Sequence, residues 1–207
     1  MLVPVRRIPV SLFLCLCALP GCATPEAPPQ DDPAAEEAPS FLPYSDDGRT
    51  VARVTPERYL GLWYEIATSG SFQQGTCVGT TATYSPIDAD TVEVYNRCLR
   101  GDLDGPASEI TGTATATDST FSRLLVDFGF GFEAPYDIVE LDGSAGDAPY
   151  AFAGVSSFEG GQLWILARRP VLDAEIYEAL VERFEDRGYT DPRGRLQMTP
   201  HAPEEAE

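Results

Sequence analysis

The sequence contains no lysine, and its single histidine, His201, lies close to the C-terminal end. A catalytic Ser-His-Asp triad or Cys-His pair requires a histidine inside the fold, and a Schiff base or phosphate-binding loop requires a lysine. A metal site built from several histidines is excluded for the same reason. The composition argues against these classes of enzyme, and we expect a non-enzymatic protein without a metal or other cofactor.

Positive charge is scarce as well, because 14 arginines stand against 33 acidic residues and give a formal charge of −19. A protein that binds nucleic acid needs a basic face against the phosphate backbone, so nucleic acid is not an expected partner. The acidic balance instead predicts a soluble, self-repelling surface. No surface patch stands out as an interface between copies of the chain.

Residues 1–21 are typical of a bacterial lipoprotein signal peptide. Two arginines precede an apolar run, residues 10–19, which is shorter than the about 20 apolar residues that a membrane helix needs. The run ends in Leu19-Pro20-Gly21-Cys22, which resembles a lipobox and implies that Cys22 carries a lipid. Ala23 is similar to an outer-membrane sorting signal, so we expect a lipid-anchored outer-membrane protein that faces the periplasm. Ordinary secretion with cleavage nearby is the alternative.

Composition divides the remainder into three parts. Residues 22–48 are rich in proline, alanine and acidic residues, and predict a disordered tether because they cannot bury enough apolar surface to fold. Residues 49–200 form the expected folded domain. Residues 201–207 form an acidic C-terminal tail that we expect to be mobile.

Short alternating segments separated by turn residues fill the expected domain and predict an all-β sandwich or barrel. The eight expected strands are 60–68, 77–85, 91–98, 109–117, 121–128, 136–141, 150–156 and 162–168. One helix follows, with Asp173 as its N-cap and Gly188 as its stop. Its apolar side chains recur on one stripe, which indicates a packing face: Ile176, Leu180, Val181 and Phe184.

Cys77 and Cys98 are the two cysteines outside the signal region, and they lie at nearly equal distances from the turn at residues 87–88. An antiparallel hairpin centred there places them opposite one another. Beyond the inner membrane the environment is oxidising, so we expect a cross-strand disulfide. The alternative is a reactive thiol in a cavity.

Two motifs about a hundred residues apart carry a family resemblance. They are Gly61-Leu62-Trp63-Tyr64-Glu65-Ile66-Ala67 and Leu163-Trp164-Ile165-Leu166-Ala167-Arg168-Arg169-Pro170. Over residues 54–200 the chain resembles the lipocalins, in particular the bacterial outer-membrane lipocalins and the apolipoprotein D group. The resemblance implies an eight-stranded antiparallel up-and-down β-barrel with one C-terminal α-helix packed outside, shaped as a cup for a small apolar molecule.

Alternation along the strands and the family resemblance together suggest which side chains line the cup. Alternation places Val94 and Asn96 on one strand, and Leu124, Val126 and Phe128 on another, towards the inside. The resemblance matches Trp164, Tyr84 and Asn96 to ligand-facing positions, and Leu166 shares a face with Trp164. It also implies that Arg168 stacks on Trp63 at the closed end, as a cation–π pair.

Two further features of the sequence concern the open end, or mouth, of the expected cup. Phe128-Gly129-Phe130-Gly131-Phe132 is either an aromatic loop at the mouth or a strand with glycine bulges. Arg97 and Arg100 are the candidates for binding a charged head group near the mouth.

The expected function is to bind, and store or transport, fatty acids or lysophospholipids. Burial of about 15 methylenes contributes roughly 12 kcal/mol, and association costs about 4–15 kcal/mol, so micromolar affinity is reasonable. Two alternatives remain: an isomerase-type enzyme on the same barrel that uses a cavity thiol, and an envelope scaffold whose barrel is filled.

Overall fold

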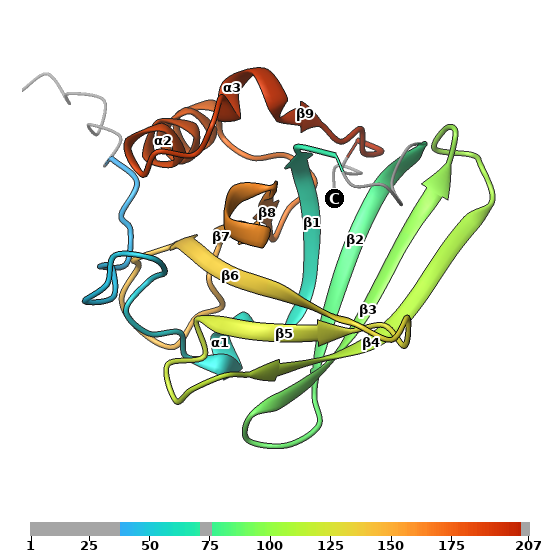
Figure 1. The fold of residues 1–207 in the computed structure, drawn as a ribbon. Coiled ribbons are helices and arrows are strands. Elements are labelled where there is room, and N and C mark those ends of the chain that lie inside the picture. The colour runs from blue at the N-terminus through green and yellow to red at the C-terminus, as the bar shows by residue number, and fades with distance from the viewer. Residues whose placement is uncertain (1–37, 71–75, 204–207) are drawn as a thin grey trace, which may run out of the picture. The chain divides into compact units, whose positions relative to one another are not determined.

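A computed structural model describes residues 38–70 and 76–203. The signal peptide, Cys22 and residues 22–37 of the expected tether lie outside the described residues. The strands are β1 (Gly61–Thr68), β2 (Cys77–Pro86), β3 (Thr91–Arg100), β4 (Ala107–Ala116), β5 (Arg123–Asp127), β6 (Glu133–Leu141), β7 (Phe152–Ser157), β8 (Gln162–Ala167) and β9 (Gln197–Met198). The helices are α1 (Pro56–Tyr59), the short 3₁₀ turn η1 (Phe158–Gly160), α2 (Ala174–Asp186) and α3 (Pro192–Arg195) (Figure 1).

The first eight strands close into an antiparallel barrel, which confirms the predicted fold class. Each strand pairs with the next along the chain, and β1 closes the ring by pairing with both β8 and β2. The turns at 87–90 and 117–122 lie at the end of the barrel that α1 covers. By the up-and-down order, loops 101–106, 128–132 and 158–161 lie at the opposite end, which is the mouth.

The C-terminal segment completes the wall between β1 and β2 near the mouth. β1 pairs with β2 only from Gly61 to Tyr64, and further along it pairs with β9. The amide of Thr199 then donates to the carbonyl of Ile66, and the amide of Gly79 donates to the carbonyl of Pro200. These bonds replace part of the missing β1–β2 ladder, so residues 197–200 connect β1 to β2 here.

Two apolar clusters lie on the two sides of the wall. One lies inside the barrel and includes Trp63, Tyr84 and Leu166. The other lies between the wall and α2, and joins Leu163 and Ile165 of β8 to Leu180, Val181 and Phe184 of α2. β8 is thus buried on both faces, which explains why its sequence is apolar throughout. The helix packs outside the barrel as expected (Figure 1).

Both predicted boundaries of the domain differ from the structure. The expected tether ran to residue 48, yet residues 38–48 belong to the folded unit. Phe41 forms a β-bridge with Asp142, and the Arg183 guanidinium lies 4.2 Å from its ring centroid. At the other end, His201 Nε2 lies 2.7 Å from the carbonyl oxygen of Glu65, so the expected mobile tail begins in a packed position. In both cases an aromatic ring in a polar segment packs on the domain or forms a hydrogen bond with it, and so holds the segment in place.

None of the helices in residues 38–70 and 76–203 is long and apolar enough to cross a membrane.

Candidate ligand site in the barrel lumen

The closed end of the barrel is built around Trp63 and Arg168. Trp63 is fully buried, and the Arg168 guanidinium lies 3.8 Å from its ring centroid. The guanidinium also donates to three backbone carbonyls, those of Tyr150 (3.0 Å), Leu62 (2.7 Å) and Arg58 (2.9 Å). Burial lowers the pKa of Arg168. One side chain therefore joins α1, β1 and the segment before β7, and seals the base.

A layer of three tyrosines lies on the inner side of this base. Tyr84 of β2 donates to the Tyr136 hydroxyl of β6 (2.8 Å), and the Tyr59 hydroxyl of α1 lies 2.8 Å from the same oxygen. β2 and β6 stand four strands apart in either direction around the ring, so the chain of hydroxyls crosses the full width of the barrel. Burial raises the pKa of all three phenols, that of Tyr84 to about 12. They remain neutral hydrogen-bond donors.

Above the tyrosine layer several interior side chains are only partly buried. On β3 the inward positions Val92 and Val94 are 4% and 3% exposed, whereas Asn96, the next inward residue, keeps part of its surface accessible. Ala82, Phe128 and Trp164 pack on the same core and are also only partly buried. The interior between these partly buried side chains, in the half of the barrel near the mouth, is the candidate lumen.

The predicted ligand-lining residues all lie on this inner side, at two depths. Five are buried in the core cluster: Tyr84, Val94, Leu124, Val126 and Leu166. Asn96, Phe128 and Trp164 lie nearer the mouth and keep accessible surface. Three further residues were not predicted from the sequence, namely Tyr59, Tyr136 and Thr80. Tyr136 alternates with the buried Ile138 on β6, and this parity is the signal that could have identified it.

Two polar atoms on the β2–β3 wall are buried without a hydrogen-bond partner among the described residues. They are Asn96 Oδ1 and Thr80 Oγ1. Asn96 pairs with Ala82, one inward position closer to the mouth than the Tyr84–Val94 pair. A buried acceptor without a donor costs free energy, so Asn96 marks a place where a ligand could supply one.

Near the mouth, the expected disulfide is present, whereas one of the two arginines expected to bind a head group does not face the lumen. Cys77 and Cys98 form a disulfide across β2 and β3, with a Cα–Cα distance of 5.4 Å, so neither offers a free thiol. Arg97 lies on the outer face, where it pairs with Glu109 at 3.5 Å, and so does not reach the lumen. Arg100 has inward parity at the rim, and its Nη2 donates to Ser108 Oγ at 3.0 Å.

The aromatic segment after β5 forms a loop at the mouth. β5 ends at Asp127 and β6 begins at Glu133, and Gly129 and Gly131 both adopt positive φ. Phe130 and Phe132 are 52% and 58% exposed. Phe128 turns inward over Gly112, where a β-carbon would come within 2.6 Å of its ring. Glycine at position 112 thus makes room for Phe128.

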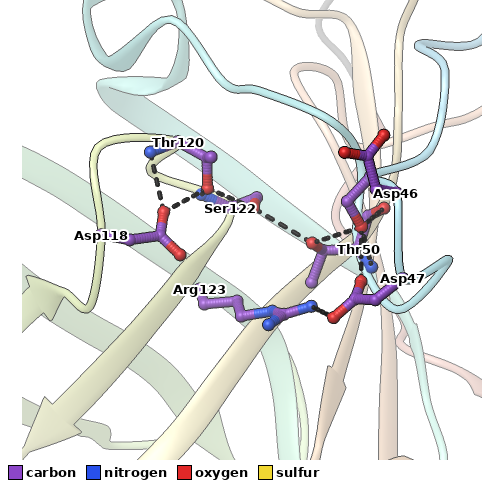
Figure 2. Close-up of a pocket in the computed structure, with 8 residues that line it drawn as sticks. Asp46, Asp47, Thr50, Asp118, Thr120, Ser122 and Arg123 are labelled. Atoms are coloured by element: carbon purple, nitrogen blue, oxygen red, sulfur yellow. Dashed lines mark hydrogen bonds and ion pairs between the residues drawn. The ribbon is translucent and has the colours of Figure 1, made fainter.

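A hollow of about 300 Å³ lies between residues 45–50 and the turn before β5, and its lining is polar (Figure 2). Its lining groups bond to one another: Arg123 pairs with Asp47 at 2.6 Å, and Thr50 and Ser122 share a 3.1 Å hydrogen bond. It is a seam that fastens residues 45–50 to the turn before β5. Among the described residues, no group of three or more His, Cys, Asp or Glu side chains is arranged to hold a metal ion.

Known proteins resemble this chain in sequence and in fold. A lipocalin of Acanthamoeba polyphaga mimivirus is 35% identical over 64% of this chain and 78% of its own. Temperature-induced lipocalin-1 of Arabidopsis thaliana is 32% identical over 73% and 82%, and outer membrane lipoprotein Blc of Vibrio cholerae is 32% identical over 65% and 77%. Insecticyanin of the tobacco hornworm Manduca sexta is a structural neighbour, with a TM-score of 0.58 at 18% identity, covering 79% of this chain and 88% of its own.

The family model described as a lipocalin-like domain matches residues 54–201, which spans the barrel and α2. The two motifs, the closed ring of eight strands, the external helix and the sealed base agree with this match. The chain belongs to the lipocalin family, close to the bacterial Blc lipoproteins.

Proposed function

We propose that this protein binds a small hydrophobic ligand in the half of the barrel near the mouth, and that a fatty acid or lysophospholipid is the ligand. The observation that carries the proposal is the change in burial along the inner wall. Inward-facing Ala82, Phe128 and Trp164 are only partly buried, whereas Val92, Val94 and Leu124 nearer the base are buried. Accessible apolar surface inside a barrel is what an apolar ligand would cover.

The test is a titration of the full-length chain with a fluorescent fatty acid analogue. We expect saturable one-to-one binding in the micromolar range, and about tenfold weaker binding by Trp164→Ala, which removes about 1.4 kcal/mol of apolar contact. The matched control is Ile87→Ala, an exposed residue in the turn at the opposite end. An absence of binding up to high micromolar concentrations would instead support the filled-barrel scaffold. The thiol enzyme is disfavoured because both cysteines of the barrel are paired.

We also propose that the chain is anchored to the outer membrane through a lipid on Cys22. The lipobox-like sequence and the likeness to outer membrane lipoproteins of Vibrio cholerae and Escherichia coli support this. In a Gram-negative host, we expect radioactive palmitate to label the chain, and Cys22→Ser to abolish the labelling. Cys17→Ser, a change within the apolar run, should leave it intact. Equal labelling of both variants would contradict the proposal.

A further inference from the structure

The three hydroxyls of the tyrosine layer have three protons, but only two of these protons are donated within the layer. Tyr84 donates to Tyr136, and Tyr59 and Tyr136 share a second bond. Each phenol has one proton to donate. Within the described part of the chain, these two bonds are the hydrogen bonds of the three hydroxyls, so one of the three protons has no acceptor.

Burial decides which hydroxyl keeps the free proton. Tyr59 is 2% exposed, while Tyr136, which packs against the cluster inside the barrel, is only partly buried. A donor without an acceptor is most unfavourable where it is most buried. Tyr59 therefore donates to Tyr136, Tyr136 accepts from both neighbours, and its own proton is free to point into the lumen.

The charge around this donor limits what can accept from it. Arg168 is the cation next to the layer, and its guanidinium is already shared among three backbone carbonyls and the Trp63 ring. An ionised carboxylate at this depth would lack a free counter-charge and would be disfavoured by desolvation. A neutral carbonyl oxygen meets the requirement. The unpartnered Asn96 Oδ1, one inward position above, can accept the proton of an un-ionised acid.

We propose that Tyr136 donates its hydroxyl proton to a carbonyl oxygen at the inner end of the ligand, so that an acyl ligand binds carbonyl-first and uncharged. The chain then runs along the apolar wall towards Trp164 and the mouth. This inference rests on the proposed function and narrows it. A fatty acid in its neutral form, a ketone or a small ester fits, whereas the bulky charged head of a lysophospholipid does not.

The test compares two ligands that differ only in the carbonyl. The full-length chain is loaded with diphenylhexatriene, a hydrocarbon probe, which is then displaced by 2-undecanone or by undecane. We expect the ketone to compete about tenfold better, the value of one hydrogen bond. Tyr136→Phe should remove this preference, and Tyr95→Phe, an outward residue of β3, should keep it.

A second variant tests whether a neighbouring hydroxyl takes over the hydrogen bond to the ligand when Tyr136 is replaced. Tyr84 loses its acceptor in Tyr136→Phe and could then donate to the ligand itself, so the double variant Tyr84→Phe, Tyr136→Phe is compared as well. A preference that survives in the double variant, or its absence in the unaltered protein, overturns the carbonyl-first orientation while hydrocarbon binding still upholds the proposed function. If the unaltered protein binds no diphenylhexatriene, both proposals fail together.

Discussion

Arg168 shows how much a single residue contributes to closing the barrel. Its replacement by methionine removes three hydrogen bonds to backbone carbonyls and the stacking on Trp63. We expect Arg168→Met to lower the free energy of unfolding by about 3 kcal/mol, measured by urea denaturation. Arg97→Met removes only an exposed ion pair and should change it by less than about 1 kcal/mol. Similar losses in the two variants would contradict this role for Arg168.

Glu140 gives the molecule a pH dependence with a definite sign. It is fully buried, accepts a hydrogen bond from Tyr44, and lies beside Arg183. Burial raises the pKa of its carboxyl above the ordinary 4.5, although Arg183 and Tyr44 oppose the shift. The native state therefore holds this proton more tightly than the unfolded state. Its stabilising effect is complete below pH 4.5 and is lost as the pH rises through the raised pKa.

Glu140→Gln mimics the protonated form, so it tests that sign. We expect the variant to match the unaltered protein at pH 4, and to become the more stable of the two as the pH rises, in urea unfolding measured at each pH. The same comparison with Glu159→Gln, which lies in an exposed ion pair, should stay flat. A variant that is less stable at neutral pH would show that Arg183 outweighs burial.

Individual residues divide into those that a sequence can identify and those that it cannot. Trp164 and Leu166 were placed inside by parity with a family motif, and the structure puts both on the inner face. Tyr59 and Tyr136 were not identified, because their hydroxyls come together only when α1 and β6 are brought into contact by the fold. Pairing between positions 77 residues apart leaves no local pattern.

At the scale of elements, the docking of α2 depends on one glycine of β7. A β-carbon at Gly154 would lie 2.8 Å from Phe184 Cζ and 3.0 Å from the β-carbon of Glu140. We expect Gly154→Ala to destabilise the fold by about 2 kcal/mol, because it forces Phe184 away from the wall. Phe184→Leu creates the missing space, so the double variant should be more stable than the sum of the single changes predicts. Strict additivity in thermal unfolding would contradict this contact.

Elements at the two ends of the domain were less predictable than the strands. The strands repeat a period of two, and α2 shows a clear apolar stripe, so both are visible in the sequence. Residues 38–48 show neither pattern, and they are held by scattered contacts such as Phe41 under Arg183. Likewise, two residues of β9 are too few to show alternation, although they help to complete the wall.

At the scale of the whole molecule, the charge of −19 should make stability depend on salt. Like charges on a compact surface repel one another, and salt screens that repulsion. We expect the midpoint of thermal unfolding to rise by a few degrees between 20 and 500 mM sodium chloride. A fall would mean that surface ion pairs, such as Arg193 with Glu178, contribute more than the net repulsion.

Because the tyrosine layer closes the lumen from below, the depth of the lumen limits the length of ligand chain that it can bury. From Val94, beside the layer, to Arg100 at the rim, β3 advances six residues, or about 15 Å along a barrel axis once strand tilt is allowed for. Each methylene that fits within this depth should improve affinity about fourfold, and each one beyond it should add almost nothing. A homologous series of ligands would therefore show a rise and then a plateau, and the bend between them would report the depth of the floor.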